Sequence, residues 1–219
     1  MKVKVRKSVL SENDQQAAIN ARRLAAQQLV GVNVLAAPGA GKTSLIVQLL
    51  KRLPRALHKG VIEGDVAGSL DTALIRKLGF PAHQINTGGG CHLSAKMVAA
   101  ALDRLRLKGP GVVFIENIGN LICPVNYRLG ESLRLVLTDV GDGDDKPVKY
   151  PGIFAAADAV VLNKIDLVPH MNFRMRFFRR GLAAATGGKT PLFLVSCRTG
   201  EGLDAVADWL IQAAELKQA

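Results

Sequence analysis

The sequence predicts an α/β protein in three layers, with a mostly parallel central sheet and helices on both faces. Short apolar runs alternate with helical patterns along the chain, which is typical of βαβ units. A glycine-rich segment at residues 36–43 follows the first apolar run and precedes a helical pattern. The chain has 219 residues, 48% of them hydrophobic, and this is enough for one domain with a sizeable core.

The first elements surround that glycine-rich segment. An amphipathic helix is predicted over residues 13–30, because apolar residues recur there at helical spacing. The apolar run at residues 32–36 predicts a strand that leads into the glycine-rich segment. Residues 43–53 return to helical spacing, and Pro54 ends that helix because proline cannot continue it.

The same alternation continues to the end of the chain. Further strands are predicted at residues 60–62, 83–86, 111–115, 133–137, 159–162 and 191–195. Further helices are predicted at residues 69–78, 92–107, 171–184 and 201–216. The polar segment 138–150 is predicted to be a loop and not a domain boundary. We therefore expect one domain over residues 1–219, with residues 1–30 as an N-terminal helical extension.

The net charge is +11, which raises the question of a nucleic-acid partner. The basic residues are scattered, with small clusters at residues 2–7, 22–23 and 174–180. Aromatic residues do not alternate with them, as an RNA-stacking surface requires. We therefore favour a solvated face or an acidic protein partner over nucleic acid, although the sequence does not explain why the charge is so high.

Composition also bears on the compartment. No apolar run reaches the roughly 18 residues of a membrane span, and the first 14 residues lack the apolar core of a secretory signal. We therefore expect a cytoplasmic location and no membrane partner. The three cysteines, Cys91, Cys123 and Cys197, are too few and too uneven for a disulfide framework. Metal binding and simple burial both stay open for them.

The segment APGAGKTS at residues 37–44 is close to the phosphate-binding pattern G-x-x-x-x-G-K-[ST] of the P-loop NTPase fold, with Ala36 in place of the first glycine. Glycines let backbone N–H groups approach phosphates, and the helix N-terminus adds partial positive charge. Lys42 is expected to reach the β- and γ-phosphates, and Thr43 to bind Mg²⁺. The predicted phosphate contacts are Pro38, Gly39, Ala40, Gly41, Lys42, Thr43 and Ser44.

A base-reading loop is predicted at the end of the strand 159–162, where Asn163, Lys164 and Asp166 form the pattern N-K-x-D. An aspartate there accepts hydrogen bonds from guanine N1–H and the exocyclic amine, whereas adenine lacks that pair of donors. Ser196 and Cys197 follow another predicted strand and are typical of the loop that supports guanine. Three such loops at strand ends together predict a GTP site.

Two cysteines fall beside this predicted site. Cys91 precedes His92 after a run of three glycines, and Cys123 follows the strand 111–115 by eight residues. Thiolate and imidazole groups suit Zn²⁺ or Ni²⁺, and two copies of an incomplete set would complete one site in a symmetric dimer. Spacing alone favours the alternative that both cysteines are small buried hydrophobic residues and His92 begins a helix.

Several segments resemble a known family, the hydrogenase nickel-incorporation GTPases called HypB, of the signal-recognition and MinD class of P-loop proteins. They are APGAGKTSL, IEGD, GCHL, IENIGNLICP, LGE, GDDKPVKYP and NKIDL, which spread over most of the chain from Gly31 onward. The resemblance implies that Cys91, His92 and Cys123 bind Ni²⁺ or Zn²⁺ at a GTP-dependent dimer interface. It also implies catalytic or Mg²⁺-binding roles for Lys42, Thr43, Asp65 and Glu116, with structural capping as the alternative for Asp65 and Glu116.

The mechanism implied by the resemblance couples nucleotide to metal. GTP·Mg²⁺ would order the regions of Asp65 and Gly119, and two subunits would close and bring their metal sets together. Slow hydrolysis would separate them and release nickel toward a hydrogenase large-subunit precursor, with a nickel-accessory protein as a further partner. Which metal is physiological and which hydrogenase is served stay open.

The sequence departs from the family pattern in three places. It has no N-terminal cysteine motif or histidine-rich stretch, Gly68 replaces the usual threonine after the IEGD aspartate, and the usual aspartate before LGE is absent. Gly68 and Ala36 leave the rate of turnover open. The rival interpretations are a urease-type nickel GTPase, whose Cys-Pro-His motif is absent here, a cobalamin-related chaperone, and a non-catalytic GTP-gated switch.

Overall fold

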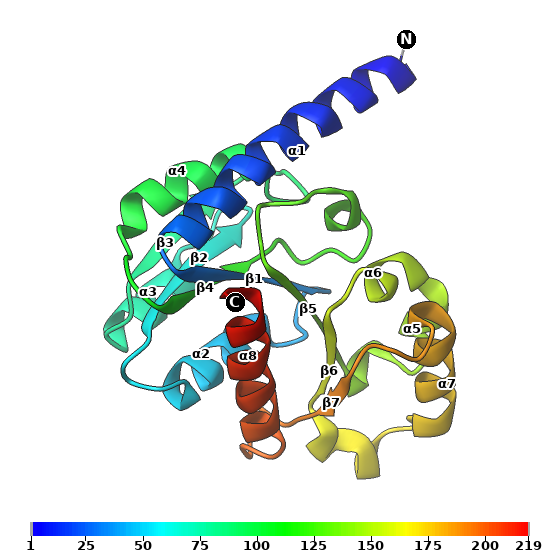
Figure 1. Cartoon of the computed structure of the whole chain (residues 1–219). Helices are drawn as coiled ribbons and strands as arrows, with labels where there is room; N and C mark the ends of the chain where they lie inside the picture. The colour runs from blue at the N-terminus through cyan, green and yellow to red at the C-terminus, as the bar shows by residue number, and fades with distance from the viewer. Residues whose placement is uncertain (1, 219) are drawn as a thin grey trace.

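The computed structural model describes residues 2–218, and the side chains of residues 9–214 (Figure 1). Seven strands form one sheet in the order β3-β2-β4-β1-β5-β6-β7, and every neighbouring pair is parallel. The strands are β1 (Leu29–Ala36), β2 (His58–Asp65), β3 (Ala82–Asn86), β4 (Gly111–Glu116), β5 (Leu133–Asp139), β6 (Ala159–Asn163) and β7 (Leu192–Leu194). Parallel strands place their carboxyl ends at one edge of the sheet, so the loops that follow them gather there.

Helices follow most strands, as the alternation in the sequence predicts. The α-helices are α1 (Lys2–Ala26), α2 (Lys42–Arg52), α3 (Leu70–Lys77), α4 (Ala95–Leu105), α5 (Lys146–Lys149), α6 (Pro151–Ala155), α7 (Met175–Thr186) and α8 (Leu203–Gln218). Three 3₁₀ helices lie in the connections: η1 (Cys123–Asn126), η2 (Val140–Asp142) and η3 (Ile165–His170). The α/β fold with helices on both faces is thus confirmed.

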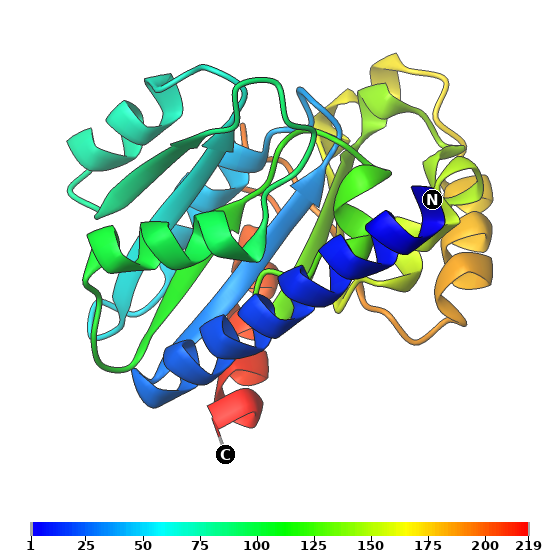
Figure 2. The ribbon, with the colours of Figure 1, turned by 90° about the horizontal axis from the view of Figure 1, so that it is seen from above.

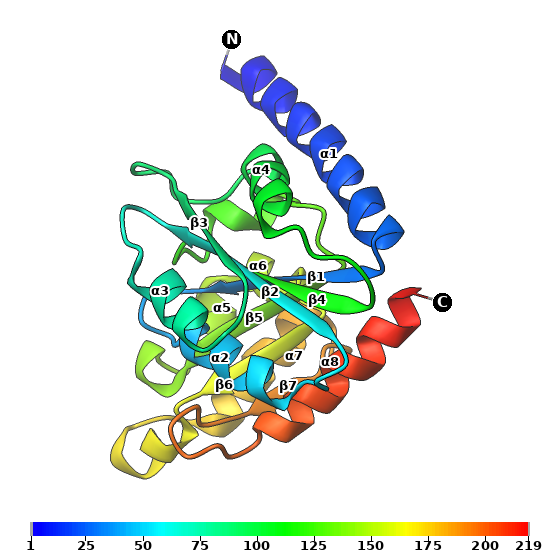
Figure 3. The same cartoon turned by 90° about the vertical axis from the view of Figure 1, so that its left-hand side faces the viewer.

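The core is divided by the alternation of side chains along each strand. Val32, Val34 and Ala36 of β1 face one apolar cluster, which also contains buried residues of α2, α3 and α8. The opposite face carries two separate clusters. One contains residues of α1 and α4, and the other contains residues of α6 and α7. Figure 3 shows the sheet between α1 and α4 on one side and α2 and α8 on the other.

The prediction for the first helix was wrong at both ends. Helix α1 begins at Lys2 and ends at Ala26, whereas a helix over residues 13–30 was predicted. Gln28 takes a positive φ of 57°, which ends the helical path, and Leu29 and Val30 begin strand β1. Both residues are buried between neighbouring elements, so tertiary packing outweighs their helical spacing. Figure 2 shows α1 running beside α4.

Most of the segment 138–150, which was predicted to be a loop, forms regular secondary structure. Thr138 and Asp139 end strand β5, and η2 and α5 follow. The Asp139 carboxylate accepts a hydrogen bond from the backbone N–H of Asp142 at 3.0 Å and so caps η2. These helices of three and four residues are too short to show helical periodicity in the sequence, as is α6.

Composition gave two further expectations, one about clusters of basic residues and one about membrane spans. The side chains of the basic cluster at residues 2–7 lie outside the described part of the chain. Within residues 2–218, no helix combines the length and apolar character that crossing a membrane requires.

Candidate functional site

The predicted phosphate-binding segment lies at the carboxyl edge of the sheet, between β1 and α2. Gly39 and Gly41 take positive φ values of 77° and 95°, which other residues rarely adopt. A Cβ atom on Gly41 would lie 2.7 Å from the side-chain nitrogen of Asn163. Pro38, Ala40 and Ser44 complete the predicted set around this turn. The segment therefore wraps the N-terminus of α2, where backbone N–H groups and the helix dipole favour phosphate.

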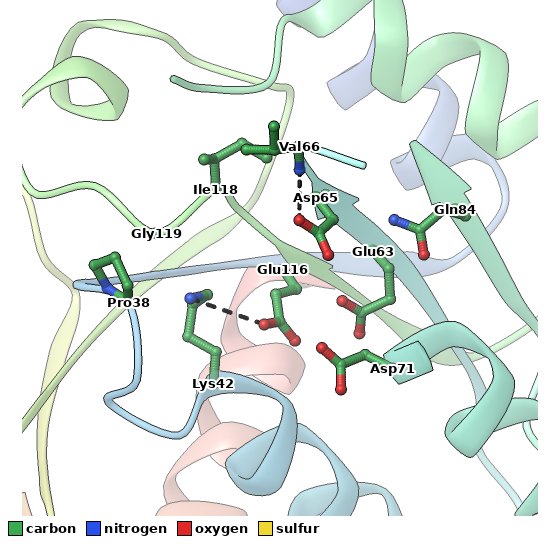
Figure 4. A pocket seen from close by; sticks show the side chains of 11 residues that line it. Pro38, Lys42, Glu63, Asp65, Val66, Asp71, Gln84, Glu116, Ile118 and Gly119 are labelled. Carbon is green, nitrogen blue, oxygen red and sulfur yellow. Dashed lines mark hydrogen bonds and ion pairs between the residues drawn. The ribbon is translucent and has the colours of Figure 1, made fainter. Parts of the chain in front are cut away.

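Two side chains at the start of α2 converge on one carboxyl group of β4. Thr43 Oγ1 donates to Glu116 Oε1 at 3.1 Å. Lys42 Nζ lies 3.9 Å from the same oxygen, as Figure 4 shows. The side chains of Lys42 and Glu116 are only 10% and 7% exposed. Hydroxyl and carboxylate oxygens are the ligands that Mg²⁺ prefers. This part of the predicted Mg²⁺ site is therefore brought together beside the phosphate-binding segment.

A second buried carboxyl group, Glu63, faces Glu116 and was missed in the sequence. Glu63 on β2 and Glu116 on β4 are partners in the strand register. Burial, followed by the charge of Glu116, raises the pKa of Glu63 to about 10, and burial raises the pKa of Glu116 to about 7. One oxygen of each, Glu63 Oε1 and Glu116 Oε2, is buried without a hydrogen-bond partner in the protein. Two such oxygens fit a proton or a cation held between them.

The signal that would have found Glu63 is its position in the segment IEGD. It lies in the apolar stretch of β2, two residues before the strand ends, and only 3% of the residue is exposed. An acid placed inside a buried strand of a parallel sheet is costly unless it is paired. Asp65, the last residue of this segment, was predicted to act in the site, whereas the buried Glu63 was not.

A pocket of about 260 Å³ adjoins this carboxyl pair and contains Asp65. Asp65 ends β2, is exposed, and accepts a hydrogen bond from the backbone N–H of Val66 at 2.5 Å. A Cβ atom on Gly68 would overlap the Asp65 carboxylate, so the glycine leaves room for the carboxylate to fold back. The pocket is lined by Pro38, Lys42, Glu63, Gly64, Asp65, Val66, Asp71, Gln84, Glu116, Ile118 and Gly119 (Figure 4).

The predicted base-reading loop is in direct contact with the phosphate-binding segment. Asn163 Nδ2 donates to the carbonyl of Ala40 at 3.0 Å, and Asn163 Oδ1 accepts from the backbone N–H of Cys197 at 3.1 Å. Asn163 is buried, with 2% of the residue exposed, and therefore fixes both loops around one side chain. A second pocket of about 410 Å³ lies here and is lined by Gly39, Gly41, Ser44, Asn163, Lys164, Asp166, Leu167, Cys197 and Arg198.

Lys164 adds a second connection between the same two loops. Its Nζ donates to the carbonyl of Gly39 and to Asp139 Oδ2, both at 2.8 Å, and its φ is 60°. Asp139 was not singled out in the sequence, because the end of β5 was read as a loop. Ser196, which is buried, accepts a hydrogen bond from the backbone N–H of Thr199 at 3.2 Å. All residues predicted to contact guanine thus lie around the second pocket or directly support it.

Among the predicted nickel or zinc ligands, Cys91 is the residue that interacts with both of the others, His92 and Cys123. Cys91 Sγ lies 3.4 Å from His92 Nδ1, and a hydrogen bond with the Cys123 thiol raises the pKa of Cys91. The His92 ring stacks on the Tyr127 ring, with centroids 3.7 Å apart. Burial lowers the pKa of His92, so the imidazole stays neutral down to a lower pH than in a free histidine. Among the described side chains, no three His, Cys, Asp or Glu residues are arranged as a complete metal site.

The three cysteines differ in their positions in the fold, and Cys91 also differs from the other two in its exposure. Cys91 is exposed and directly precedes His92, whereas Cys123 is partly buried and begins η1. Cys197 lies instead in the base-reading loop, where burial raises the pKa of its thiol to about 11. The alternative that Cys91 is a buried hydrophobic residue is therefore wrong, and helix α4 begins at Ala95, not at His92.

Comparison with known proteins gives one family. Residues 31–190 match the sequence model described as CobW/HypB/UreG, nucleotide-binding domain. A hydrogenase maturation factor HypB of Rhizobium leguminosarum bv. viciae is 46% identical over 208 residues, which are 95% of this chain and 69% of that protein. A hydrogenase/urease maturation factor HypB of Helicobacter pylori is 36% identical, over 96% of this chain and 87% of that protein.

Solved structures give the same result at the level of the fold. The crystal structure of HypB from Helicobacter pylori in complex with nickel superposes with a TM-score of 0.88 at 35% identity, covering 94% of this chain and 97% of that chain. HypB from Archaeoglobus fulgidus gives 0.86 at 33% identity, covering 93% and 99%. A signal recognition particle receptor, FtsY from Elizabethkingia anophelis, shares the fold at a TM-score of 0.53 and 15% identity.

Proposed function

The chain belongs to the CobW/HypB/UreG family of nucleotide-binding domains, and within it to the HypB hydrogenase maturation factors, and on this premise we propose that it is a GTP-hydrolysing metallochaperone. It binds GTP and Mg²⁺, carries nickel, and delivers that nickel during maturation of a nickel–iron hydrogenase. The chain acts as a single domain, and GTP binding pairs two copies of it.

The observation that carries the proposal is the junction at Asn163. One buried amide holds the carbonyl of Ala40 in the phosphate-binding segment and the backbone N–H of Cys197 in the base-reading loop. The phosphate and base pockets are therefore preformed parts of one site, and preorganisation lowers the free-energy cost of binding. Asp166 lies in the base pocket, where its carboxylate selects guanine by accepting two hydrogen bonds.

Hydrolysis is proposed to occur in the pocket that holds Asp65. A water molecule attacks the γ-phosphorus, and the bond to the bridging β–γ oxygen breaks. Lys42 offsets the charge that develops on the phosphates, and Asp65 orients the water. Thr43 and Glu116 would hold Mg²⁺, which would supply further positive charge at the phosphate oxygens. No side chain acts as an arginine finger in this assignment, so we propose slow turnover by the protein alone.

Nickel is the proposed cargo of Cys91, His92 and Cys123. The contact between Cys91 Sγ and His92 Nδ1 supports this, as does the related HypB of Helicobacter pylori, whose crystal structure is a complex with nickel. A thiolate pair and a neutral imidazole suit Ni²⁺ and Zn²⁺ alike. Since one chain offers at most three ligands, a second copy is proposed to complete the coordination and to form the GTP-dependent dimer. The hydrogenase precursor and a nickel-accessory protein are the proposed partners.

The function is tested by measuring mass and nickel content together. We expect a monomer with GDP and Mg²⁺, and a dimer with a non-hydrolysable GTP analogue, Mg²⁺ and Ni²⁺, by light scattering after size exclusion. Calorimetry is expected to show GTP binding and no measurable ATP binding. A monomer under both conditions, although the analogue is bound, would contradict the dimer mechanism.

A second candidate, a GTP-gated switch without hydrolysis, is favoured by one observation. The space beside Gly68 is taken by the Asp65 carboxylate, which accepts its hydrogen bond from Val66. Asp65 in that position is turned back on its own loop. Tight GTP binding without release of phosphate would support this candidate and overturn the assignment of a hydrolase.

A further inference from the structure

We propose that four buried polar side chains, Asn117, Asn33, Glu131 and Arg134, connect the nucleotide pocket to both loops that carry the proposed nickel ligands. We call these four residues the polar relay. The inference rests on the proposed function, because it assigns residues to the coupling between GTP and metal. None of the four belongs to the predicted phosphate, base or metal contacts.

The first end of the polar relay is Asn117, which directly follows β4 and is fully buried. Its Oδ1 accepts hydrogen bonds from the backbone N–H groups of Ile118 at 2.9 Å and Leu93 at 3.1 Å. Ile118 and Gly119 line the pocket that contains Lys42, and a Cβ atom on Gly119 would lie 2.9 Å from Pro38 Cγ. Any shift of this segment on nucleotide binding therefore reaches Leu93, two residues after Cys91.

The middle of the polar relay crosses strand β1. Asn117 Nδ2 donates to Asn33 Oδ1 at 3.2 Å, and Asn33 Nδ2 donates to Glu131 Oε1 at 3.4 Å. Asn33 is fully buried in a strand whose other side chains are apolar. A buried amide that loses its hydrogen-bond partner carries the full unfavourable free energy of desolvation. The two bonds are therefore expected to shift together, because breaking either one alone is unfavourable.

The far end of the polar relay holds the loop of Cys123. Glu131 Oε1 accepts from Arg134 Nε at 2.6 Å, and both side chains are almost completely buried. Arg134 donates in turn to the carbonyls of Val125 at 3.0 Å and Tyr127 at 3.1 Å, within and just after η1. Tyr127 also stacks on His92. The same guanidinium thus positions the segment after Cys123 and the ring against His92.

The surroundings of the polar relay favour its action as one unit. Asn33 and Arg134 are partners in the register between β1 and β5. They lie on the sheet face that carries two apolar clusters, one containing Val113 and Ile115 and the other containing Leu35 and Val136. Well-packed apolar side chains on both sides offer the polar groups no alternative partner. Coupling between two binding sites is reciprocal, so under this proposal bound metal changes nucleotide affinity as well.

Helix α1 connects the same two loops by separate bonds, which provides a matched control. Asn13 Oδ1 accepts from the backbone N–H of Ala95 at 2.9 Å, and Asn13 Nδ2 donates to the carbonyl of Arg128 at 2.8 Å. Asn13→Ala therefore loosens the segments after His92 and after Tyr127 without removing any bond of the polar relay.

The test measures amide hydrogen exchange of nickel-free protein, with Mg²⁺ and either GDP or a non-hydrolysable GTP analogue. In the unaltered protein we expect the analogue to change exchange at Ile118, Leu93 and Leu129, whose N–H donates to Glu131 Oε2. Asn33→Ala is expected to keep the changes at Ile118 and Leu93 and to lose the change at Leu129. Asn33→Ser also removes the side-chain amide but keeps a polar group, and it replaces the alanine variant if that variant folds poorly. Asn13→Ala is expected to keep all three changes.

A second readout uses nickel itself. Nickel affinity with the analogue and with GDP is expected to differ by about 5- to 150-fold in the unaltered protein, and by less than about twofold after Asn33→Ala. A change at Leu129 that survives both Asn33 variants would overturn the polar relay, even in a protein that binds GTP and nickel. Failure of the unaltered protein to bind the analogue or nickel would instead overturn the proposed function, and this inference with it.

Discussion

Glu63 and Glu116 are register partners on neighbouring strands, and their carboxyl groups face each other beside Lys42. Two acids so placed cannot both be ionised without a compensating charge. The pair therefore ties the stability of the nucleotide site to pH and to cations.

Stability without nucleotide and divalent cations is expected to fall as pH rises. The pKa values of Glu116 and Glu63 are raised from 4.5 to about 7 and about 10, so the folded protein keeps protons that the unfolded chain releases. Their contribution is complete below about pH 4.5 and is lost as pH rises through the folded values, by at most about 1.4 kcal/mol per pH unit for each group. Urea denaturation in EDTA at pH 5, 7 and 9 measures this fall.

Glu63→Gln provides the variant for that experiment. The amide keeps the shape of Glu63 and cannot ionise, so the fall above pH 7 is expected to be smaller. Glu201→Gln, which changes an exposed acid, is the control and is expected to follow the unaltered protein. If the unfolding free energies of the unaltered protein and Glu63→Gln changed identically with pH, a proton held between Glu63 and Glu116 would be contradicted.

Asp166→Asn is expected to weaken GTP binding strongly, by about 10⁴-fold, because the amide cannot accept from both guanine donors and leaves them unpaired. The loss is expected to be smaller for xanthosine triphosphate, whose carbonyl replaces the guanine amine. Calorimetry with both nucleotides measures this. Asp204→Asn removes an exposed acid on α8 that pairs with Arg52, and is expected to leave both affinities unchanged. Equal losses for both nucleotides would contradict the role of Asp166.

The three cysteines allow an internal comparison of the nickel site. Cys91→Ala and Cys123→Ala are each expected to lower nickel stoichiometry in the presence of the GTP analogue, since each removes a thiolate ligand. Cys197→Ala is the matched control, because that thiol lies in the base-reading loop. Equilibrium dialysis with Ni²⁺ measures the stoichiometry. Unchanged binding by Cys91→Ala would remove the assigned site.

Gly68→Thr is expected to displace the Asp65 carboxylate, because the added Cβ atom occupies its space. Asp65 would then be free to turn toward the phosphate pocket. We expect phosphate release to rise about tenfold, which corresponds to about 1.4 kcal/mol in the activation free energy. Gly79→Ala, at a position with open space but a positive φ, controls for loss of a glycine. A rate that is unchanged or lower in Gly68→Thr would show that the position of Asp65 does not limit turnover.

Arg134→Met is expected to lower the free energy of unfolding by about 3–5 kcal/mol, because it leaves the Glu131 carboxylate buried without its partner. Arg52→Met removes one side of the exposed pair with Asp204 and is expected to cost at most about 1 kcal/mol. Urea denaturation of the two variants compares them. A similarly small loss of unfolding free energy in both variants would show that Glu131 is not buried as an ionised carboxylate.

The sequence was sufficient for the fold and for the loops whose chemistry is local. Gly41, Lys42 and Thr43 are neighbours in the chain, and so are Asn163 and Lys164, so a short pattern identifies each group. The family resemblance is confirmed by the comparisons. The assignment of roles to individual site residues stays a prediction.

What the sequence did not predict depends on contacts between distant segments. Glu63 becomes notable only when β2 pairs with β4, and Asp139 only when Lys164 reaches it. Spacing alone had favoured burial for Cys91 and Cys123, and only the family resemblance placed them with His92 in one predicted metal site. The short helices α5 and α6 contain too few residues for a periodic signal.

The polar residues on one face of the sheet also divide its apolar surface into independent halves. The cluster under α1 and α4 and the cluster under α6 and α7 share no member. Asn33 lies on β1 between Leu29 of the first cluster and Leu35 of the second, and Arg134 is its register partner on β5. Changes in residues that do not touch usually add in their effects on stability. Substitutions in one half are therefore expected to change the free energy of unfolding by the same amount whether or not the other half is substituted.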